Sequence, residues 1–264
     1  PLIEDATFTG AVTIDVQITK STSEIVLNAA ELTIASVSIR RGDETIDPTW
    51  RLDSDTERMH LHLDSLLAAG SATIDITFAG ILNDQLRGFY LSTYIDDDGV
   101  ERTIATSQMQ STDARRAFPC WDEPEWKATY STTLDVDAEH LAVSNAAIVD
   151  ETMLDNGLRR VKFAKTMKMS TYLVAFVVGP LEATEPVDAG GVPVRVVHQP
   201  GQGHLTSFAL DVAVHALTWF QEYYDIPYPG DKVDLIAVPD FAFGAMENLG
   251  CVTFRDVLLV IDPD

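Results

Sequence analysis

Hydrophobic residues alternate with polar or small residues along most of the first 185 positions, a pattern that predicts half-buried β-strands. The first such run has five apolar side chains of one parity: Phe8, Val12, Ile14, Val16 and Ile18. Similar alternation occurs at 59–63, 74–78 and 130–136. Together these runs predict a mainly β first domain, an antiparallel β-sandwich or saddle.

Turn signals divide this region into hairpins. Asp-Gly at 98–99 and Asn-Gly at 156–157 each separate two strand-like runs. The parity of the apolar residues changes between Ile34 and Val37, which indicates a bulge or a break between two strands. The unbroken apolar run 173–178 predicts a strand covered on both faces.

The pattern changes after a linker-like stretch near residue 185. A long helix is expected at 205–224, and apolar runs at 233–238 and 251–254 predict two strands. The apolar residues of the helix fall on one face: Leu205, Phe208, Val212, Ala216, Trp219 and Tyr223. We therefore expect two domains, 1–187 and 188–264, the second being the incomplete start of a mixed α/β domain.

Composition narrows the class of partner. The chain has 264 residues, 46% of them hydrophobic, and a formal charge of −23. This charge argues against binding to nucleic acid or to an anionic membrane, and no apolar run is long enough for a transmembrane helix. The negative charge favours a cationic ligand, or simply makes the protein soluble. Two distant cysteines, Cys120 and Cys251, are expected to be buried thiols, which weakly favours a cytoplasmic location and leaves localisation open.

Two segments carry candidate chemistry. Residues 244–248 read Gly-Ala-Met-Glu-Asn between two apolar runs. A Gly beside an Ala allows a substrate backbone to come close, and the Glu offers one carboxylate, which suits capture of an extended peptide by its free amino end. Residues 108–124 read Gln-Met-Gln-Ser-Thr-Asp-Ala-Arg-Arg-Ala-Phe-Pro-Cys-Trp-Asp-Glu-Pro.

Both segments, in this order, resemble conserved segments of the M1 (gluzincin) zinc aminopeptidases. The resemblance implies a β-saddle domain followed by the start of a thermolysin-like α/β catalytic domain. It implies that the full-length protein removes N-terminal residues from peptides with Zn²⁺. The family's His-Glu-x-x-His and later Glu are not in this chain. We therefore expect no catalytic residue, no metal ligand, no bound zinc and no peptidase activity in this chain alone.

The resemblance also implies roles for the residues of segment 244–248. Glu247 would bind the substrate's α-ammonium group, which presents three donors and a full charge. The backbone of Gly244, Ala245 and Met246 would pair with the substrate main chain. Asn248 is expected to shape the loop.

Two glutamines would complete this substrate site. Gln108 matches the family residue that lines the pocket for the first side chain. Gln110 stands where most members have a second amine-binding Glu, so the sequence departs from the common pattern there. An amide oxygen still accepts a hydrogen bond from the ammonium group but carries no charge.

Other polar clusters have simpler interpretations. Asp113, Arg115 and Arg116 are expected to form a structural salt-bridge network. His60 and His62 share one face of a strand, but no third ligand accompanies them, so a metal site is not favoured. Asp-Glu-Pro at 122–124 predicts a capped turn, and His215 a partly buried packing residue on the helix: neither is expected to be catalytic.

Two functional hypotheses remain from the sequence. The chain is either the substrate-recognition part of an aminopeptidase, or part of a non-catalytic M1-like scaffold that binds partner proteins. The partners expected for the first are peptides with a free N-terminus and the remaining catalytic and C-terminal domains of the same chain.

Overall fold

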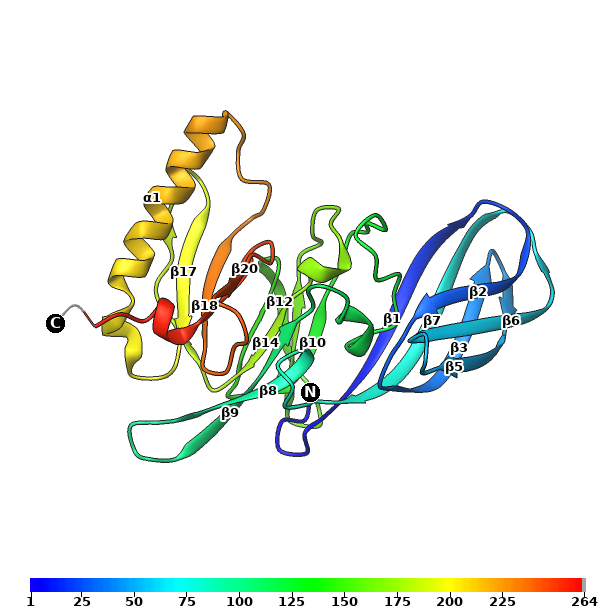
Figure 1. The fold of residues 1–264 in the computed structure, drawn as a ribbon, viewed down its shortest axis with the longest axis horizontal. Coiled ribbons are helices and arrows are strands. Elements are labelled where there is room, and N and C mark those ends of the chain that lie inside the picture. The colour runs from blue at the N-terminus through cyan, green and yellow to red at the C-terminus, as the bar shows by residue number, and fades with distance from the viewer. Residues whose placement is uncertain (263–264) are drawn as a thin grey trace.

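The computed structural model describes residues 1–262 and begins with two antiparallel sheets packed face to face. The first has the order β1-β7-β3-β4 and the second β2-β6-β5, both seen on the right of Figure 1. Their bounds are Thr7–Ile18 (β1), Thr22–Asn28 (β2), Leu32–Arg41 (β3), Glu44–Ile46 (β4), Thr49–Asp53 (β5), Arg58–Leu67 (β6) and Gly70–Ile81 (β7).

The predicted alternation places one face of these strands in a shared core. Side chains from both sheets are almost fully buried there: Leu27, Ile39, Met59, Leu61, Ile74 and Ile76. The parity change between Ile34 and Val37 is a β-bulge within the single strand β3, where the register with β7 shifts between Ile34 and Ser36. The bulge allows both halves of β3 to contribute apolar side chains to one core.

A second pair of antiparallel sheets follows. One has the order β10-β13-β12 and the other β11-β14-β9-β8; we call the latter the central sheet. Their bounds are Gly88–Ile95 (β8), Glu101–Gln108 (β9), Thr133–Asp137 (β10), Leu141–Ser144 (β11), Ile148–Met153 (β12), Leu158–Phe163 (β13) and Phe176–Gly179 (β14). The two predicted hairpins are confirmed as β8–β9 and β12–β13.

The strand expected over 173–178 is only partly correct. Residues Thr171–Leu173 form a short 3₁₀-helix, and β14 begins at Phe176. The backbone N–H of Ala175 donates to the Asn145 side chain instead of to a neighbouring strand. An apolar run fixes burial but not backbone geometry, and all the residues from Val174 to Val178 except Phe176 are buried.

The third part is a mixed sheet with one helix. Its order is β15-β17-β18-β20-β19, with β16 also paired to β17, and β17, β18 and β20 are parallel. The bounds are Glu182–Ala183 (β15), Val187–Asp188 (β16), Pro193–His198 (β17), Val233–Val238 (β18), Ala245–Met246 (β19) and Cys251–Arg255 (β20). Short 3₁₀ turns are Ala114–Arg116, Gln202–Leu205 and Asp256–Leu258, and the helix α1 spans Ser207–Tyr224. The mainly β fold with an α/β end is confirmed, while the boundary after residue 187 stays a prediction.

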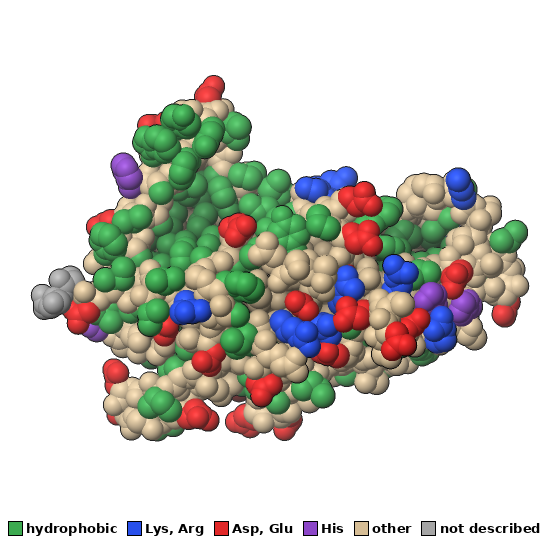
Figure 2. Space-filling view, in the orientation of Figure 1, with side chains coloured by type: hydrophobic (Ala, Val, Ile, Leu, Met, Phe, Trp, Pro, Cys, Tyr) green, Lys and Arg blue, Asp and Glu red, His purple; other side chains and the backbone are tan. Residues whose placement is uncertain are grey.

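Helix α1 packs with a different face from the one that the sequence pattern selects. The residues against the sheet are Ala209, Leu210, Ala213, Val214 and Leu217. Phe208, Trp219 and Tyr223 are 60%, 46% and 65% exposed. Figure 2 shows hydrophobic side chains gathered on the surface at and beside α1. His215 is exposed and not a packing residue. The helix is apolar on both sides, so its periodicity alone does not identify the side that contacts the sheet.

The central sheet is covered on both faces because neighbouring residues of its strands enter different cores. Ile104 of β9 and Val143 of β11 pack against Ile236 and Val238 of the mixed sheet, while Ala105 enters the core of the first two sheets. The β-rich region and the α/β end are therefore joined by a continuous hydrophobic interface.

Both cysteines are buried and unpaired, as expected. Burial raises the pKa of the Cys120 thiol well above its ordinary value, and raises that of Cys251 to about 12. Of the helices within residues 1–262, none combines the length and the apolar character needed to cross a bilayer.

Candidate functional site

Segment 244–248 lies at the edge of the mixed sheet that contains β17, β18 and β20. Ala245 and Met246 form the short strand β19, antiparallel to Phe254 and Thr253 of β20. The Gly244 carbonyl accepts a hydrogen bond from the backbone N–H of Arg255 at 2.9 Å. In the part of the chain that the structure describes, no strand pairs with the other side of β19. The segment therefore offers a free strand edge.

Side chains alternate between the interior and the solvent along this segment. Met246 is fully buried, Glu247 is exposed and Asn248 is buried. Met246 contributes to the interface core together with Ile236 of β18. The alternation follows from extended backbone, in which successive side chains point to opposite sides. It directs the Glu247 carboxylate away from the core.

The Glu247 carboxylate is free of protein partners. Among residues 1–262 it accepts no hydrogen bond and forms no ion pair. Asn248, in contrast, is held in the loop: its Nδ2 donates to Thr253 Oγ1 at 3.4 Å, and its carbonyl accepts from the backbone N–H of Cys251. An exposed, unpaired carboxylate next to a rigidly packed residue can bind a cation without first breaking an internal ion pair.

The two candidate glutamines lie together at the end of β9. Gln108 is the last residue of that strand and is 2% exposed, and Gln110 follows it in solvent. The amide Nε2 of Gln108 donates to the Gln110 carbonyl at 3.5 Å. The peptide bond between Gln110 and Ser111 is cis.

Buried polar atoms without partners occur in both segments. Gln108 Oε1 and Asn248 Oδ1 are buried and accept no hydrogen bond from any residue between 1 and 262. A buried acceptor without a donor costs about 1–3 kcal/mol, so each position favours a donor from water or from a ligand.

The structure connects the two segments through packing and not through direct bonds. Ile104 of β9 and Met246 of β19 belong to the same hydrophobic cluster. Within the described chain, no hydrogen bond joins Gln108 or Gln110 to Glu247. The distance from Gln108 and Gln110 to Glu247 therefore depends on how the mixed sheet packs against the central sheet.

Asp113, Arg115 and Arg116 form the structural network that we expected, and it also includes Asp122, which was expected in a capped turn. Arg115 pairs with Asp122 at 3.1 Å and with Glu57 at 3.0 Å, and Arg116 pairs with Asp113 at 2.8 Å. The Asp122 side chain is fully buried and also accepts from Thr171 Oγ1. These side chains neutralise one another and are not candidates for catalysis.

The histidine pair is confirmed on one strand face. His60 and His62 lie on β6 with ring centroids 6.2 Å apart, and both Nδ1 atoms face Glu24 Oε1, at 2.9 and 3.7 Å. Throughout residues 1–262, no group of three or more His, Cys, Asp or Glu side chains is arranged to hold a metal ion. The described residues therefore do not fit a zinc centre.

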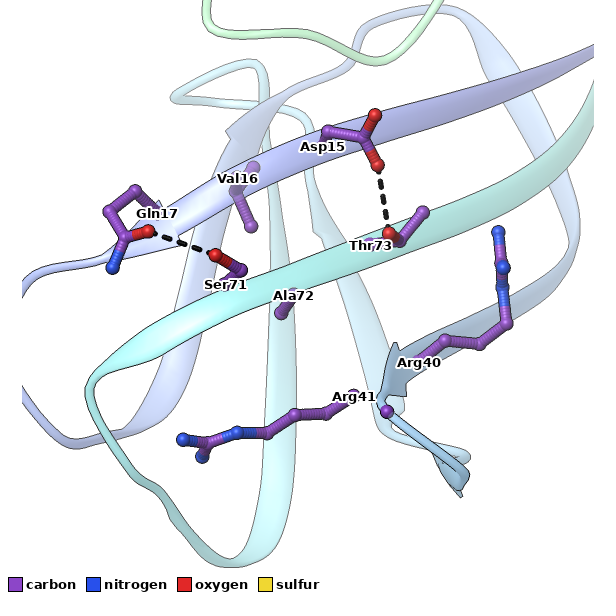
Figure 3. A pocket seen from close by; sticks show the side chains of 9 residues that line it. Asp15, Val16, Gln17, Arg40, Arg41, Ser71, Ala72 and Thr73 are labelled. Atoms are coloured by element: carbon purple, nitrogen blue, oxygen red, sulfur yellow. Dashed lines mark hydrogen bonds between the residues drawn. The ribbon is translucent and has the colours of Figure 1, made fainter.

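A surface depression lies at the right of the molecule in Figure 1, away from β20. It has a volume of about 510 Å³ and lies over β1, β7 and β3 (Figures 1 and 3). Its cations are already engaged: Arg40 pairs with Asp75 at 2.6 Å, and Arg41 donates to the Ala68 and Ala69 carbonyls. This depression is therefore not a candidate anion site.

Comparison with known proteins identifies the family. The Peptidase M1 N-terminal domain matches residues 1–173, and the Peptidase family M1 domain matches residues 208–264. The chain belongs to the M1 peptidase family. The sequence resemblance is thereby confirmed, and the matched parts correspond to the N-terminal domain and the start of the catalytic domain.

Named relatives include three aminopeptidases. The chain is 41% identical over 266 residues to puromycin-sensitive aminopeptidase of Caenorhabditis elegans, covering 100% of this chain and 28% of the relative. It is 43% identical over 261 residues to aminopeptidase M1 of Arabidopsis thaliana, covering 97% and 30%. It is 39% identical over 263 residues to endoplasmic reticulum aminopeptidase 1 of Rattus norvegicus, covering 98% and 28%.

The chain thus spans less than a third of the length of the curated relatives that it matches. Aminopeptidases of this family depend on zinc.

Proposed function

We propose that this chain is the substrate-recognition part of a zinc-dependent aminopeptidase that removes N-terminal residues from peptides. The observation that carries the proposal is the exposed, unpaired carboxylate of Glu247 on a free strand edge. The proposed domains are 1–187 and 188–264, and this boundary lies between the two family matches.

Glu247 binds the α-ammonium group of the substrate. The carboxylate is available because no described residue pairs with it. The formal charge of the whole chain, −23, also favours a cationic ligand. A charged hydrogen bond of this kind contributes about 1.5–3 kcal/mol, enough to distinguish a free amino end from a blocked one.

The backbone of segment 244–248 binds the substrate main chain. Strand β19 pairs with β20 on one side only. An extended peptide that adds along the other side would form main-chain hydrogen bonds with Gly244, Ala245 and Met246. Such pairing fixes the direction of the peptide and leaves its first residue beside Glu247.

Gln108 and Gln110 complete the recognition site. The unpartnered Oε1 of Gln108 is available to accept a hydrogen bond at the pocket for the first side chain. Gln110 is exposed one residue beyond Met109, and its amide oxygen accepts from the ammonium group without adding charge. Glu247 is then the stronger of the two anchors, because it alone carries a full negative charge.

Zinc would be held outside this chain. The described residues contain no suitable ligand group, so the ligands and the general base belong to the remaining catalytic domain. We expect that part of the protein to contain His-Glu-x-x-His and a later Glu. If the full-length sequence lacked these residues, the alternative of a non-catalytic scaffold would replace the enzyme.

The test is Glu247→Gln in the full-length protein. We expect kcat/KM for a peptide with a free N-terminus to fall about 10- to 100-fold, the loss of one charged hydrogen bond. The melting temperature should stay within about 2 °C, because the side chain is exposed and unpaired. The matched control is Glu139→Gln, an exposed glutamate on a turn after β10.

An N-acetylated peptide separates amine binding from a general loss of activity. It should be a poor substrate of the parent, and Glu247→Gln should change its turnover less than twofold. If Glu247→Gln leaves kcat/KM for the free peptide within twofold of the parent, Glu247 does not anchor the amine and the proposal is wrong.

A further inference from the structure

One asparagine of the β-rich region, Asn145, binds the backbone directly after segment 244–248. Asn145 directly follows β11 and is 6% exposed. Its Nδ2 donates to the Leu249 carbonyl at 2.8 Å and to the Leu173 carbonyl at 2.7 Å, while its Oδ1 accepts from the N–H of Ala175 at 3.0 Å. One side chain therefore connects the loop to both β11 and the start of β14.

A buried lysine reinforces the same connection. Lys232 is 8% exposed, and its ammonium group uses all three donors: to the Ser144 carbonyl at 2.6 Å, the Gly250 carbonyl at 2.6 Å and Asp234 at 2.7 Å. Asp234 is in turn held by Arg195 at 2.6 and 3.1 Å. The Lys232 and Asp234 charges are therefore paired within the interface, and the hydrogen bonds of Lys232 fix the position of the Gly250 carbonyl relative to Ser144.

The backbones come into direct contact at this point. Gly250 has a φ of +72°, and a Cβ there would lie 1.9 Å from the Asn145 carbonyl oxygen. Its N–H donates to the Tyr228 hydroxyl at 2.9 Å, and burial raises the pKa of that hydroxyl. The chain two residues beyond Asn248 therefore has no room to shift towards β11.

The other end of the loop is held by the opposite edge of the central sheet. The Asp240 carboxylate accepts a hydrogen bond from the backbone N–H of Thr93 at 2.8 Å, and its own N–H donates to Ser92 Oγ at 2.8 Å. The Tyr90 hydroxyl donates to the Asp240 carbonyl at 2.9 Å, and burial raises the pKa of Tyr90, which keeps this donor protonated. All three partners lie on β8.

The two attachments have a geometric consequence. β11 and β8 are the two edges of the central sheet, and β9, which ends at Gln108, lies between them. The loop from Asp240 to Gly250 is therefore fixed at both ends to the sheet that also carries the glutamines.

We propose that Asn145 and Asp240 are positioning residues that fix segment 244–248 to the two edges of the central sheet and so set the distance between Glu247 and the glutamines Gln108 and Gln110. Neither side chain touches the substrate. The inference rests on the proposed function, because the distance matters only if both sides bind the same peptide.

The test is a double-mutant cycle in the full-length protein. Asn145→Ala and, separately, Asp240→Ala are each combined with Glu247→Gln, and kcat/KM is measured with a free N-terminal peptide. Residues that act through one another have non-additive effects. We expect each alanine variant to lower kcat/KM about tenfold alone, and less than twofold when Glu247 is already Gln.

Asn83→Ala is the matched control. Asn83 also makes three hydrogen bonds to backbone groups, those of Gln85, Arg87 and Phe89, but all lie within one turn of the β-rich region. It should lower stability without lowering kcat/KM more than twofold in either background. Asp240 is exposed, so Asp240→Ala keeps the test open if Asn145→Ala does not fold.

The outcomes distinguish the two proposals. If Glu247→Gln alone has no effect, amine anchoring is wrong and the positioning role falls with it. If Glu247→Gln lowers kcat/KM and the alanine variants lower it by the same factor in both backgrounds, only the positioning role is wrong. The same holds if both alanine variants leave the parent rate unchanged.

Discussion

Gly250→Ala is the sharpest test of how the α/β end is seated on the central sheet. The change adds one methyl group where the structure leaves no space, 1.9 Å from the Asn145 carbonyl oxygen and 3.3 Å from the Lys232 carbonyl oxygen. Both neighbours are backbone atoms and cannot rotate away. The interface must open, or the loop must move.

Two costs add at this position. A left-handed φ costs an L-residue about 1–2 kcal/mol, and overpacking costs about 1–3 kcal/mol more. Gly157 separates the two, because it has a φ of +84° and no heavy atom within 4 Å of a built Cβ. Gly157→Ala should therefore show the backbone cost alone.

The assay is thermal unfolding of the 264-residue chain followed by circular dichroism. At about 2–4 °C per kcal/mol, Gly250→Ala should melt roughly 2–12 °C below Gly157→Ala. Equal melting temperatures within about 2 °C would refute the close backbone contact. In the full-length protein, the same variant should also lower kcat/KM for a free N-terminal peptide.

Four further predictions concern buried groups and the helix. Lys232→Met removes the ammonium group that donates to both the Ser144 and the Gly250 carbonyls and should cost about 3–5 kcal/mol, measured by urea unfolding. Cys120 and Cys251 should resist iodoacetamide at pH 8 in the folded chain and react in urea, because burial raises both thiol pKa values. The folded Cys251 thiol stays protonated up to a pKa of about 12 while the unfolded thiol ionises near its ordinary value of 9.0, so stability should fall as pH rises between these values, and less steeply in Cys251→Ala. Leu217→Ala should lower the melting temperature at least twice as much as Trp219→Ala, because Leu217 packs on the sheet and Trp219 is 46% exposed.

The lysine and helix predictions each have a control, and each of the following results would contradict one prediction. Lys162→Met breaks an exposed ion pair with Asp150 and should cost under about 1 kcal/mol. A similarly small cost for Lys232→Met would mean that the buried Lys232 contacts do not stabilise the interface. Rapid alkylation of the native chain would mean that a thiol is accessible. A larger loss from Trp219→Ala than from Leu217→Ala would mean that the other face of α1 packs on the sheet.

The sequence was sufficient where local pattern and global fold agree. The alternation in β1 and the Gly-containing turns at 98–99 and 156–157 predicted strands and hairpins that the structure confirms. A shift of the strand pairing by one residue would move all the apolar side chains of such a strand from the core to the solvent. The pattern therefore constrains both the register of the strand and the face that it buries.

The sequence was insufficient where apolar residues surround an element. In α1, periodicity selected Phe208 and Trp219, but Leu210 and Leu217 pack on the sheet. In the run 173–178, burial was predicted correctly for most residues but the strand begins only at Phe176. Hydrophobicity specifies how much of an element is buried, and the partner surface decides which side.

The candidate site divides in the same way. Segment 244–248 is recognisable because a carboxylate beside two small residues is a local and contiguous pattern, and Gln108 is recognisable because segment 108–124 resembles a conserved segment of the family. Lys232 and Asn145 were not found by the sequence reasoning. The one available signal was Asp234 inside an otherwise apolar strand, since a buried carboxylate requires a nearby cation.

The sequence by itself determined the family, the mainly β fold and the identity of the residues proposed to meet a peptide's amino end. Only the tertiary structure decided that the loop bearing Glu247 is fixed to both edges of the sheet that carries Gln108. The physical reason is that alternation and turn chemistry act over a few neighbouring residues, whereas Asn145 and Leu249, or Thr93 and Asp240, meet only after more than a hundred intervening residues have packed.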